Sequence, residues 1–298
     1  MDLAEITLRD KEFFDRHLRL YNPDTSELTF TNFFAWRNFY RFKYTEINGL
    51  LCVIAIPLKS EPYALMPMGD LNRDSFEEAF SKLTEHFKQK GWKPLFKKIP
   101  QKGLEYFKSH ITSENDVVLD RDNSDYLYNT ADLINLKGKK YDGKRNHINK
   151  FKSKYEYEYV PLNCQLIEEC SRIMEEWCIE KHCDCQEGDY CERQANMELL
   201  KNFRVLECKG ALMKVDGIYE AFTVGEMLNK DTAVIHIEKA NTHVDGLFTY
   251  INQQFCEREW KDTLYINREQ DLGLEGMRKA KLSYKPYKMM EKYTVYSA

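Results

Sequence analysis

The sequence predicts an α+β protein built from two copies of one unit. Two-residue turns of the kind that close β-hairpins stand at Asn48–Gly49 and Asp216–Gly217, each between runs of strand-forming residues. Each hairpin is preceded by a helix and followed by a third strand, an amphipathic helix, a further strand and a short helix. One order of elements used twice indicates a duplication, with domains at 1–135 and 136–298.

The elements of each copy follow from periodicity and turn residues. Apolar residues recur every three to four positions where a helix is expected and every second position where a strand is expected. In the first copy we expect a helix over 31–40, strands over 62–68 and 93–99, a helix over 75–91 and a short helix over 101–110. In the second copy we expect a helix over 196–206, strands over 232–240 and 262–268, a helix over 246–260 and a short helix over 272–282.

Composition limits the function classes. The 44 basic residues nearly balance 48 acidic ones, for a net charge of -4, which argues against coating of nucleic acid by overall charge but permits a local basic patch. No apolar run approaches the roughly 18 residues of a membrane span, and the first ten residues lack the pattern of a signal peptide. The sequence therefore predicts a cytoplasmic protein without transmembrane segments, whose nine cysteines are reduced thiols.

A cluster of cysteines raises the question of a metal. Cys178, Cys183, Cys185 and Cys191 could be read as a zinc set, but the single residue between Cys183 and Cys185 suits that geometry poorly. Helical spacing assigns Cys178 to core packing, and the acids around Cys183 and Cys185 indicate a loop. No metal site is predicted.

Four sequence blocks resemble one known family. They are YDGKRNHINKF (141–151), EAFTVGEML (220–228), VIHIEKAN (234–241) and NREQDLGLEGMRKAKLSYKP (267–286). Together they are similar to the phosphatidylglycerol lysyltransferase C-terminal-like family, which is related to the Fem-type aminoacyltransferases, and the resemblance covers nearly the whole chain.

The resemblance implies a tandem repeat of two GNAT-like domains, each a mixed sheet flanked by helices, with the site in the second. It also implies transfer of an acyl or aminoacyl group, with the acceptor end of aminoacyl-tRNA as a candidate donor and partner. Membrane synthases of the family use a lipid hydroxyl and carry a multi-span region that this sequence does not show. A lipid-headgroup acceptor and a small-molecule acceptor therefore both stay open.

The segments where acyl-CoA would bind argue against that donor. Enzymes of this fold that use acetyl-CoA hold its pyrophosphate with a glycine-rich loop at the start of the central helix. The segments here, 66–76 and 239–250, each contain one glycine next to an aspartate, which would repel phosphate. Aminoacyl-tRNA is thus preferred to acyl-CoA as donor.

Polar residues on two strands form the candidate catalytic set. Strand alternation places His236 and Glu238 on one face, and Asn267 and Glu269 together on a second strand that we expect to lie beside the first. Glu238 is the first candidate for a general base or amine anchor, and Asn267 could donate to an oxyanion. The alternative is a structural polar network. Exposure of Glu238 and Glu269 in a cleft would favour catalysis, and carboxylates sealed in ion pairs would oppose it.

Basic residues near the predicted domain boundary form the candidate donor-binding set. A helix over 144–151 should bury Ile148 and Phe151 and expose much of its charge. We expect phosphates of the tRNA acceptor end to contact some of these cations, a base to stack on the tyrosine, and the last short helix to contribute two more cations. The candidate donor-binding residues are Lys140, Tyr141, Lys144, Arg145, Arg278 and Lys281. The alternative is a solvated helix face.

Four functions therefore compete, of which the fourth, a zinc-dependent module, rests only on the cysteines. The first is an acyltransferase of the aminoacyl type, and the second is a non-catalytic binding or regulatory protein that retains the fold. An acetyl-CoA-dependent N-acetyltransferase is the third, and the missing loop counts against it. The sequence does not indicate the acceptor or the oligomeric state.

Overall fold

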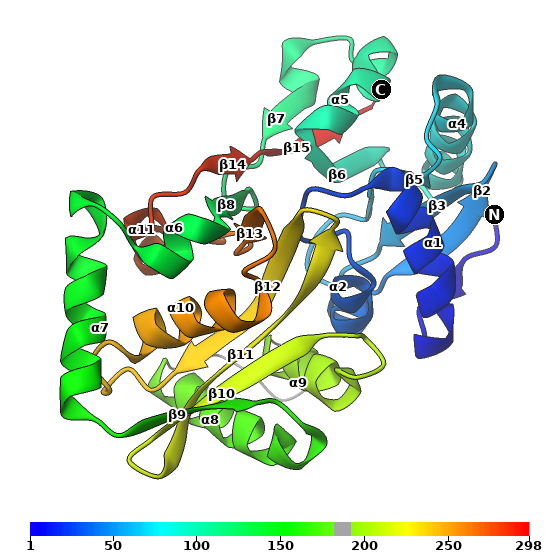
Figure 1. Cartoon of the computed structure of the whole chain (residues 1–298). Helices are drawn as coiled ribbons and strands as arrows, with labels where there is room; N and C mark the ends of the chain where they lie inside the picture. Colours follow the sequence, from blue (N-terminus) through cyan, green and yellow to red (C-terminus); the bar gives the residue numbers. More distant parts are fainter. Residues whose placement is uncertain (182–191, 298) are drawn as a thin grey trace. The chain divides into compact units, whose positions relative to one another are not determined.

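The computed structural model describes residues 1–181 and 192–297 (Figure 1). The chain forms two compact units that interleave along the sequence. Unit 1 comprises Met1–Asp125, Gln270–Glu275 and Met289–Ala298, and unit 2 comprises Tyr126–Glu269 and Gly276–Lys288. The sequence-predicted limits of the repeat, 1–135 and 136–298, stay a prediction.

The sheet of unit 1 has the strand order β1-β2-β3-β4-β6-β15-β7, with β5 also paired to β3. It is mixed, because β4 and β6 run parallel while the other pairs run antiparallel. Its strands are β1 (Ala4–Glu5), β2 (Lys43–Ile47), β3 (Leu50–Ala55), β4 (Tyr63–Ala64), β5 (Met68–Gly69), β6 (Leu95–Pro100), β7 (Val117–Leu119) and β15 (Lys292–Tyr296). Its α-helices are α1 (Lys11–Tyr21), α2 (Phe30–Ala35), α3 (Arg37–Tyr40), α4 (Arg73–Gln89) and α5 (Leu104–Phe107).

Helix α4 closes the main core of unit 1. Its apolar residues Phe76, Phe80, Leu83 and Phe87 recur at helical spacing and are buried against β3 and β6. The predicted strand over 62–68 is interrupted, because β4 ends at Ala64 and β5 begins only at Met68. Pro67, which has no N–H to donate, stands at this interruption.

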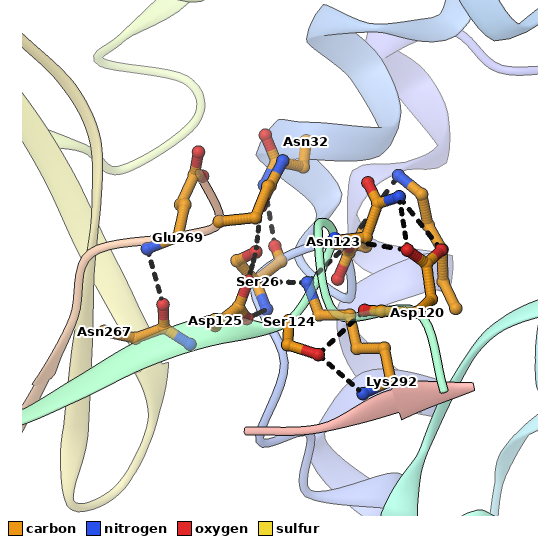
Figure 2. Close-up of polar contacts among 12 residues, drawn as sticks. Ser26, Asn32, Asp120, Asn123, Ser124, Asp125, Asn267, Glu269 and Lys292 are labelled. Atoms are coloured by element: carbon orange, nitrogen blue, oxygen red, sulfur yellow. Dashed lines mark hydrogen bonds and ion pairs between the residues drawn. The ribbon is translucent and has the colours of Figure 1, made fainter. Parts of the chain in front are cut away.

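A buried ion-pair network joins distant parts of unit 1. Lys292 on β15 is fully buried and contacts Glu27 at 2.6 Å and Asp125 at 2.5 Å. Asp125 also accepts hydrogen bonds from the backbone and hydroxyl of Ser26, at 2.7 and 2.9 Å. The amide of Lys292 donates to the Ser124 hydroxyl (Figure 2). The network thereby fixes the C-terminal strand to the first sheet.

We expect Lys292→Met to lower the free energy of unfolding by about 3–5 kcal/mol, because Asp125 would stay buried without its cation and Glu27 would keep only Lys98, at 3.5 Å. Chemical denaturation of this variant measures the loss. Lys288→Met, at an exposed position four residues earlier, is the control and should change stability by less than about 0.5 kcal/mol. Equal stability of the two variants would contradict the prediction.

The sheet of unit 2 has the strand order β14-β8-β13-β12-β11-β10-β9. It too is mixed, since β12 and β13 run parallel. Its strands are β8 (Asp125–Asn129), β9 (Tyr157–Pro161), β10 (Lys209–Val215), β11 (Ile218–Asn229), β12 (Thr232–Ala240), β13 (Tyr265–Asn267) and β14 (Lys288–Met290). Its α-helices are α6 (Thr130–Asn135), α7 (Asp142–Lys154), α8 (Ile167–Glu180), α9 (Glu192–Asn202), α10 (Leu247–Glu259) and α11 (Glu275–Ser283).

Helices cover both faces of this second sheet. Figure 1 shows α10 over one face and α8 with α9 against the other. Helix α7 buries Ile148 and Phe151 against α10, as the sequence predicts. No helix within residues 1–181 and 192–297 is long and apolar enough to cross a membrane.

Both predicted hairpin turns are confirmed. The φ angles are 49° and 75° at Asn48 and Gly49, and 48° and 87° at Asp216 and Gly217, so each turn has two residues with positive φ. The flanking residues pair directly, Ile47 with Leu50 and Val215 with Ile218.

A second backbone feature is shared by the two units. Phe96 on β6 pairs with the parallel strand β4, and Asn267 on β13 pairs with the parallel strand β12. Two residues beyond each of them, a charged residue adopts positive φ: 57° at Lys98 and 54° at Glu269. Such angles are uncommon outside glycine, so their recurrence at matching positions supports the duplication.

Candidate functional site

The candidate site of unit 2 lies where β12 and β13 part. The two strands pair in parallel only as far as Val234 and Asn267, and β12 then continues to Ala240 with β11 alone. Side chains from β12, from the segment after β13, from α10 and from α7 meet in this region. The β12–β13 site is defined here as Lys144, Glu238, Asn252, Arg268 and Tyr284.

A buried ion pair forms the centre of the β12–β13 site. Glu238 accepts hydrogen bonds from Arg268 Nη2 and from Asn252 Nδ2, both at 2.8 Å. Burial alone would lower the pKa of Arg268, but the negative charge of Glu238 outweighs it and raises the pKa above its usual value. Arg268 is therefore a permanent cation at this position.

Two polar atoms of the site lack partners. Nη1 of Arg268 and Oδ1 of Asn252 are buried and make no hydrogen bond within the described part of the chain, although the Arg268 guanidinium also interacts with the Tyr284 hydroxyl. Buried donors and acceptors almost always find a partner in the protein, in water or in a ligand. Both atoms belong to side chains that bind the carboxylate of Glu238 through their other nitrogen atoms.

Tyr284 connects Lys144 to this ion pair. The buried ring of Tyr284 has Lys144 Nζ 3.7 Å from its centroid and the guanidinium carbon of Arg268 at 4.6 Å. Burial and the positive charge of Arg268 lower the pKa of Lys144 to about 8, against the opposite effect of Glu238. Lys144 is thus a desolvated amine inside the site rather than a cation on an open helix face.

His236 is held between two carboxylates. Its Nδ1 lies 2.9 Å from Glu269 and its Nε2 lies 2.9 Å from Glu226, and only 2% of its side chain is exposed. Burial alone would lower the pKa of His236, but the two carboxylates outweigh that effect and raise it to about 9. With both ring nitrogens engaged, His236 is an imidazolium that positions Glu269.

Asn267 supports the turn that carries Glu269. Its Oδ1 accepts a hydrogen bond from the Glu269 amide at 2.8 Å, shown in Figure 2, and its side chain is fully buried. This contact stabilises Glu269 at its positive φ. The predicted contact of Asn267 with an oxyanion stays a prediction.

The two predicted carboxylates are therefore both ion-paired. The side chain of Glu238 is 11% exposed and that of Glu269 is 21% exposed, and each contacts a cation at hydrogen-bond distance. Exposure of these carboxylates in a cleft would have favoured a catalytic role for them. Neither carboxylate is an unengaged base. The physical reason is that buried carboxylates require charge partners.

Two of the predicted donor-binding residues, Lys140 and Arg145, differ in how far they are engaged by the protein. Lys140 is about half exposed, 3.5 Å from Asp132. Arg145 is engaged by the carbonyls of Leu136 and Gly138 and by Asp142. These contacts show that Arg145 stabilises the start of α7.

Tyr141 lies in the core of unit 2. Its hydroxyl donates to the Tyr284 carbonyl at 3.0 Å, and its ring is fully buried. The ring thus contributes to packing, and a base could stack on it only if the neighbouring side chains moved. The predicted contact of Tyr141 with a base stays a prediction.

The two predicted cations of the last helix lie on α11. Lys281 donates to the Arg268 carbonyl, and Tyr128 donates to the Lys281 carbonyl at 2.8 Å. Lys281 therefore supports the segment that bears Arg268. Arg278 is half-buried on the same helix.

The described residues contain no group of three or more metal-ligating side chains suitable for an ion. Cys178 lies near the end of α8, whereas Cys183, Cys185 and Cys191 fall outside the described residues. Two cavities, of about 380 Å³ in unit 1 and about 320 Å³ in unit 2, are lined by residues outside the β12–β13 site.

Sequence reasoning missed Arg268, Asn252 and Tyr284. Strict alternation along β13 places Arg268 opposite Asn267, but β13 ends at Asn267 and the backbone turns at Glu269, which brings Arg268 to Glu238. Asn252 gives no strand or helix signal beyond its place on the central helix. The position of Arg268 between Asn267 and Glu269 was the one indication in the sequence that Arg268 belongs to the site.

The start of α10 is packed closely against α7. Gly246 precedes α10 with φ of 83°, and a Cβ added there would lie 2.3 Å from the His147 carbonyl oxygen. Asp245 is bound by Lys150 at 2.7 Å. Helix α7 therefore lies directly against the residues that precede α10.

Gly246→Ala should destabilise the protein by at least about 2 kcal/mol, from positive φ at a non-glycine residue together with the contact with His147. Thermal or chemical denaturation measures it. Gly143→Ala is the matched control, because that glycine lies on α7 with open space around it and should be neutral or slightly stabilising. A neutral Gly246→Ala would show that α7 does not cover the start of α10.

Comparison with known proteins decides the family. A family model described as "Phosphatidylglycerol lysyltransferase, C-terminal" matches residues 18–296. The chain belongs to this family. Its predicted membership is thereby confirmed.

Similar structures confirm the fold class. A conserved protein of unknown function from Bacteroides thetaiotaomicron VPI-5482 is 34% identical, with a TM-score of 0.91 over 100% of both chains. L-PGS from Bacillus licheniformis is 17% identical, with a TM-score of 0.68 over 100% of this chain and 94% of that chain. A tandem GNAT protein from the clavulanic acid biosynthesis pathway is 8% identical, with a TM-score of 0.51 over 100% and 98%. The family member is thus a tandem GNAT-like protein.

An uncharacterised protein of Mycoplasmoides gallisepticum is 26% identical over 199 residues, which is 64% of this chain and 61% of that protein. The chain thus matches less than two thirds of this relative's length. The family is that of the phosphatidylglycerol lysyltransferase C-terminal region, and the fold is that of tandem GNAT proteins.

Proposed function

We propose that this family member transfers an aminoacyl group from aminoacyl-tRNA to a hydroxyl or amine acceptor at the β12–β13 site. The observation that carries the proposal is the unmatched pair of Arg268 Nη1 and Asn252 Oδ1, both buried beside Glu238. An aminoacyl ester presents a carbonyl oxygen, which accepts hydrogen bonds, close to an α-ammonium group, which donates them. The two unmatched atoms have the complementary chemistry.

Each of these contacts would assist the reaction. Arg268 would stabilise the negative charge that develops on the carbonyl oxygen when the acceptor attacks. Asn252 Oδ1, with the Glu238 carboxylate behind it, would bind the ammonium group. An acetyl group has the carbonyl but no ammonium, and so would leave Asn252 unmatched. The proposed chemistry therefore favours an aminoacyl donor over acetyl-CoA.

The helix starts support the same choice of donor. In unit 2 the start of α10 is covered by α7, as described above. In unit 1 the first turn of α4 is capped by its own residues, since Asn72 accepts from the Ser75 amide and Ser75 interacts in return with the Asn72 amide. These contacts crowd both helix starts and so disfavour a pyrophosphate there. Exposed cations near the start of α7, such as Lys139 and Lys140, would contact tRNA phosphates.

A second function is favoured by the ion pairs of Glu238 and Glu269. A binding protein that retains the fold needs no unengaged base, and these two carboxylates are engaged. Such a protein would recognise the same aminoacyl group through Arg268 and Asn252 without transferring it.

Binding of radiolabelled aminoacyl-tRNA, compared with the same tRNA after deacylation, tests the proposal. We expect the charged form to bind more tightly, and Asn252→Leu to reduce that preference by about 5–10-fold, the value of one buried hydrogen bond. Asn149→Ala, at an exposed position on α7, is the control. Equal binding of charged and deacylated tRNA, or thermal stabilisation by acetyl-CoA alone, would contradict the proposal.

A further inference from the structure

Lys144 is partly buried and pairs with no carboxylate of the described residues, unlike several other lysines of unit 2. Lys140, Lys150 and Lys239 each pair with a carboxylate, on Asp132, Asp245 and Glu192 respectively. Lys144 Nζ has no hydrogen bond and no carboxylate within 4 Å among the residues of the described ranges, and its ammonium group lies over the Tyr284 ring. Its amine is therefore held in the site by packing and keeps its hydrogen-bonding capacity for a reactant.

Burial and the charge of Arg268 favour loss of the Lys144 proton, against the opposite effect of Glu238. Those that face it are Glu238 from β12, Arg268 after β13 and Tyr284 after α11. On its own helix, Asp142 is engaged by Arg145. Burial and Arg268 place the pKa of Lys144 at about 8, so about a tenth of the molecules carry a neutral amine at neutral pH. An ordinary lysine would be almost wholly protonated there.

The other ionisable groups near the site are committed elsewhere. Glu238 holds Arg268 and Asn252, and both nitrogens of His236 contact carboxylates. Aminoacyl transfer requires a group that removes the proton of the acceptor and returns one to the leaving oxygen. Among these residues, Lys144 alone combines position in the site with an uncommitted amine.

We propose that Lys144 is the proton-transfer residue of the β12–β13 site, an inference that rests on the proposed function. The neutral amine takes the proton of the acceptor O–H or N–H as the acceptor oxygen or nitrogen forms its bond to the ester carbonyl carbon. The tetrahedral intermediate carries its negative charge on the oxygen facing Arg268. When the carbon–oxygen bond to the ribose breaks, the Lys144 ammonium protonates the ribose oxygen and becomes an amine again.

Loss of radiolabelled amino acid from pooled aminoacyl-tRNA tests this step, because it reports transfer to any acceptor, water included. The unaltered protein should act faster as pH rises, with an inflection near the pKa of Lys144. Lys144→Arg keeps the positive charge but cannot act as a base, so it should bind the donor normally and react about 10²–10⁴-fold more slowly, without that inflection. Lys152→Met, at an exposed position on the same helix, should behave as the unaltered protein.

A second measurement reports on Lys144 without using activity. Competitive labelling of amines with acetic anhydride, read by mass spectrometry across pH, gives the basicity of Lys144 relative to Lys152. We expect Lys144 to titrate about 2 pH units below the ordinary lysine value. Titration together with Lys152 would overturn the inference, as would Lys144→Arg with normal rate and pH profile, or with a defect confined to donor binding.

The two proposals fail in different ways. If the unaltered protein releases no amino acid while Lys144 still labels as a weakly basic amine, the proposed function is overturned. The proton-transfer role of Lys144 is then overturned with it. If the unaltered protein is active and Lys144→Arg is equally active, the proposed function stands and the role of Lys144 is overturned.

Discussion

Arg268→Met is expected to lower the free energy of unfolding by about 3–5 kcal/mol and to abolish transfer. The stability loss follows because Glu238 would stay buried with its charge and only the Asn252 amide to bind it. The activity loss follows because the proposed oxyanion contact disappears. Denaturant unfolding and amino acid release from charged tRNA measure the two effects separately.

A double variant separates structure from chemistry. Glu238→Met combined with Arg268→Met removes both charges, so much of the lost stability should return while transfer stays absent. Arg193→Met, which removes an exposed arginine 3.7 Å from Glu175, should change stability by less than about 1 kcal/mol. An Arg268→Met protein as stable as the Arg193→Met control would contradict the buried ion pair.

The stability of the protein is expected to fall as pH rises from about 6.5 to about 9, by about 3 kcal/mol from His236 alone. The folded-state pKa of His236 is raised to about 9, while its unfolded value is about 6.5. Its contribution is therefore fully present below the unfolded value and is lost as pH passes through the folded value. Urea unfolding at pH 6, 7.5 and 9 measures this dependence.

His236→Gln provides the comparison for that experiment. The variant should be less stable at pH 6, because Glu226 and Glu269 lose the cation between them, and its stability should change less over the same pH range. The same slope in both proteins would show that other groups produce the pH dependence.

Local signals in the sequence predicted much of the fold. The turns at Asn48–Gly49 and Asp216–Gly217 specify hairpins because their central residues tolerate positive φ, and α10 and β12 match their predicted ranges within a residue. The pairing of β15 with β6 was not predicted, because contacts between residues so far apart leave no local signal. Lys292, whose burial depends on that pairing, could not be recognised either.

The site was predicted less completely. Alternation along β12 singled out His236 and Glu238, and in the structure β13 pairs with β12 and Glu269 contacts His236. Alternation fails after Asn267 because the backbone turns there, and so Arg268 was overlooked. Burial of Tyr141 and the desolvation of Lys144 depend on packing of α7 against distant residues, which helical periodicity does not report.

Release of amino acid from tRNA tests the central claim most directly. With enzyme in excess over pooled, radiolabelled aminoacyl-tRNA, the account predicts release faster than in buffer by at least about 10²-fold, and little acceleration by Arg268→Lys, which cannot present the same forked guanidinium. Phosphatidylglycerol vesicles, added in a parallel series, distinguish a lipid-headgroup acceptor from water. Release no faster than in buffer, with and without vesicles, would contradict aminoacyl transfer at the β12–β13 site.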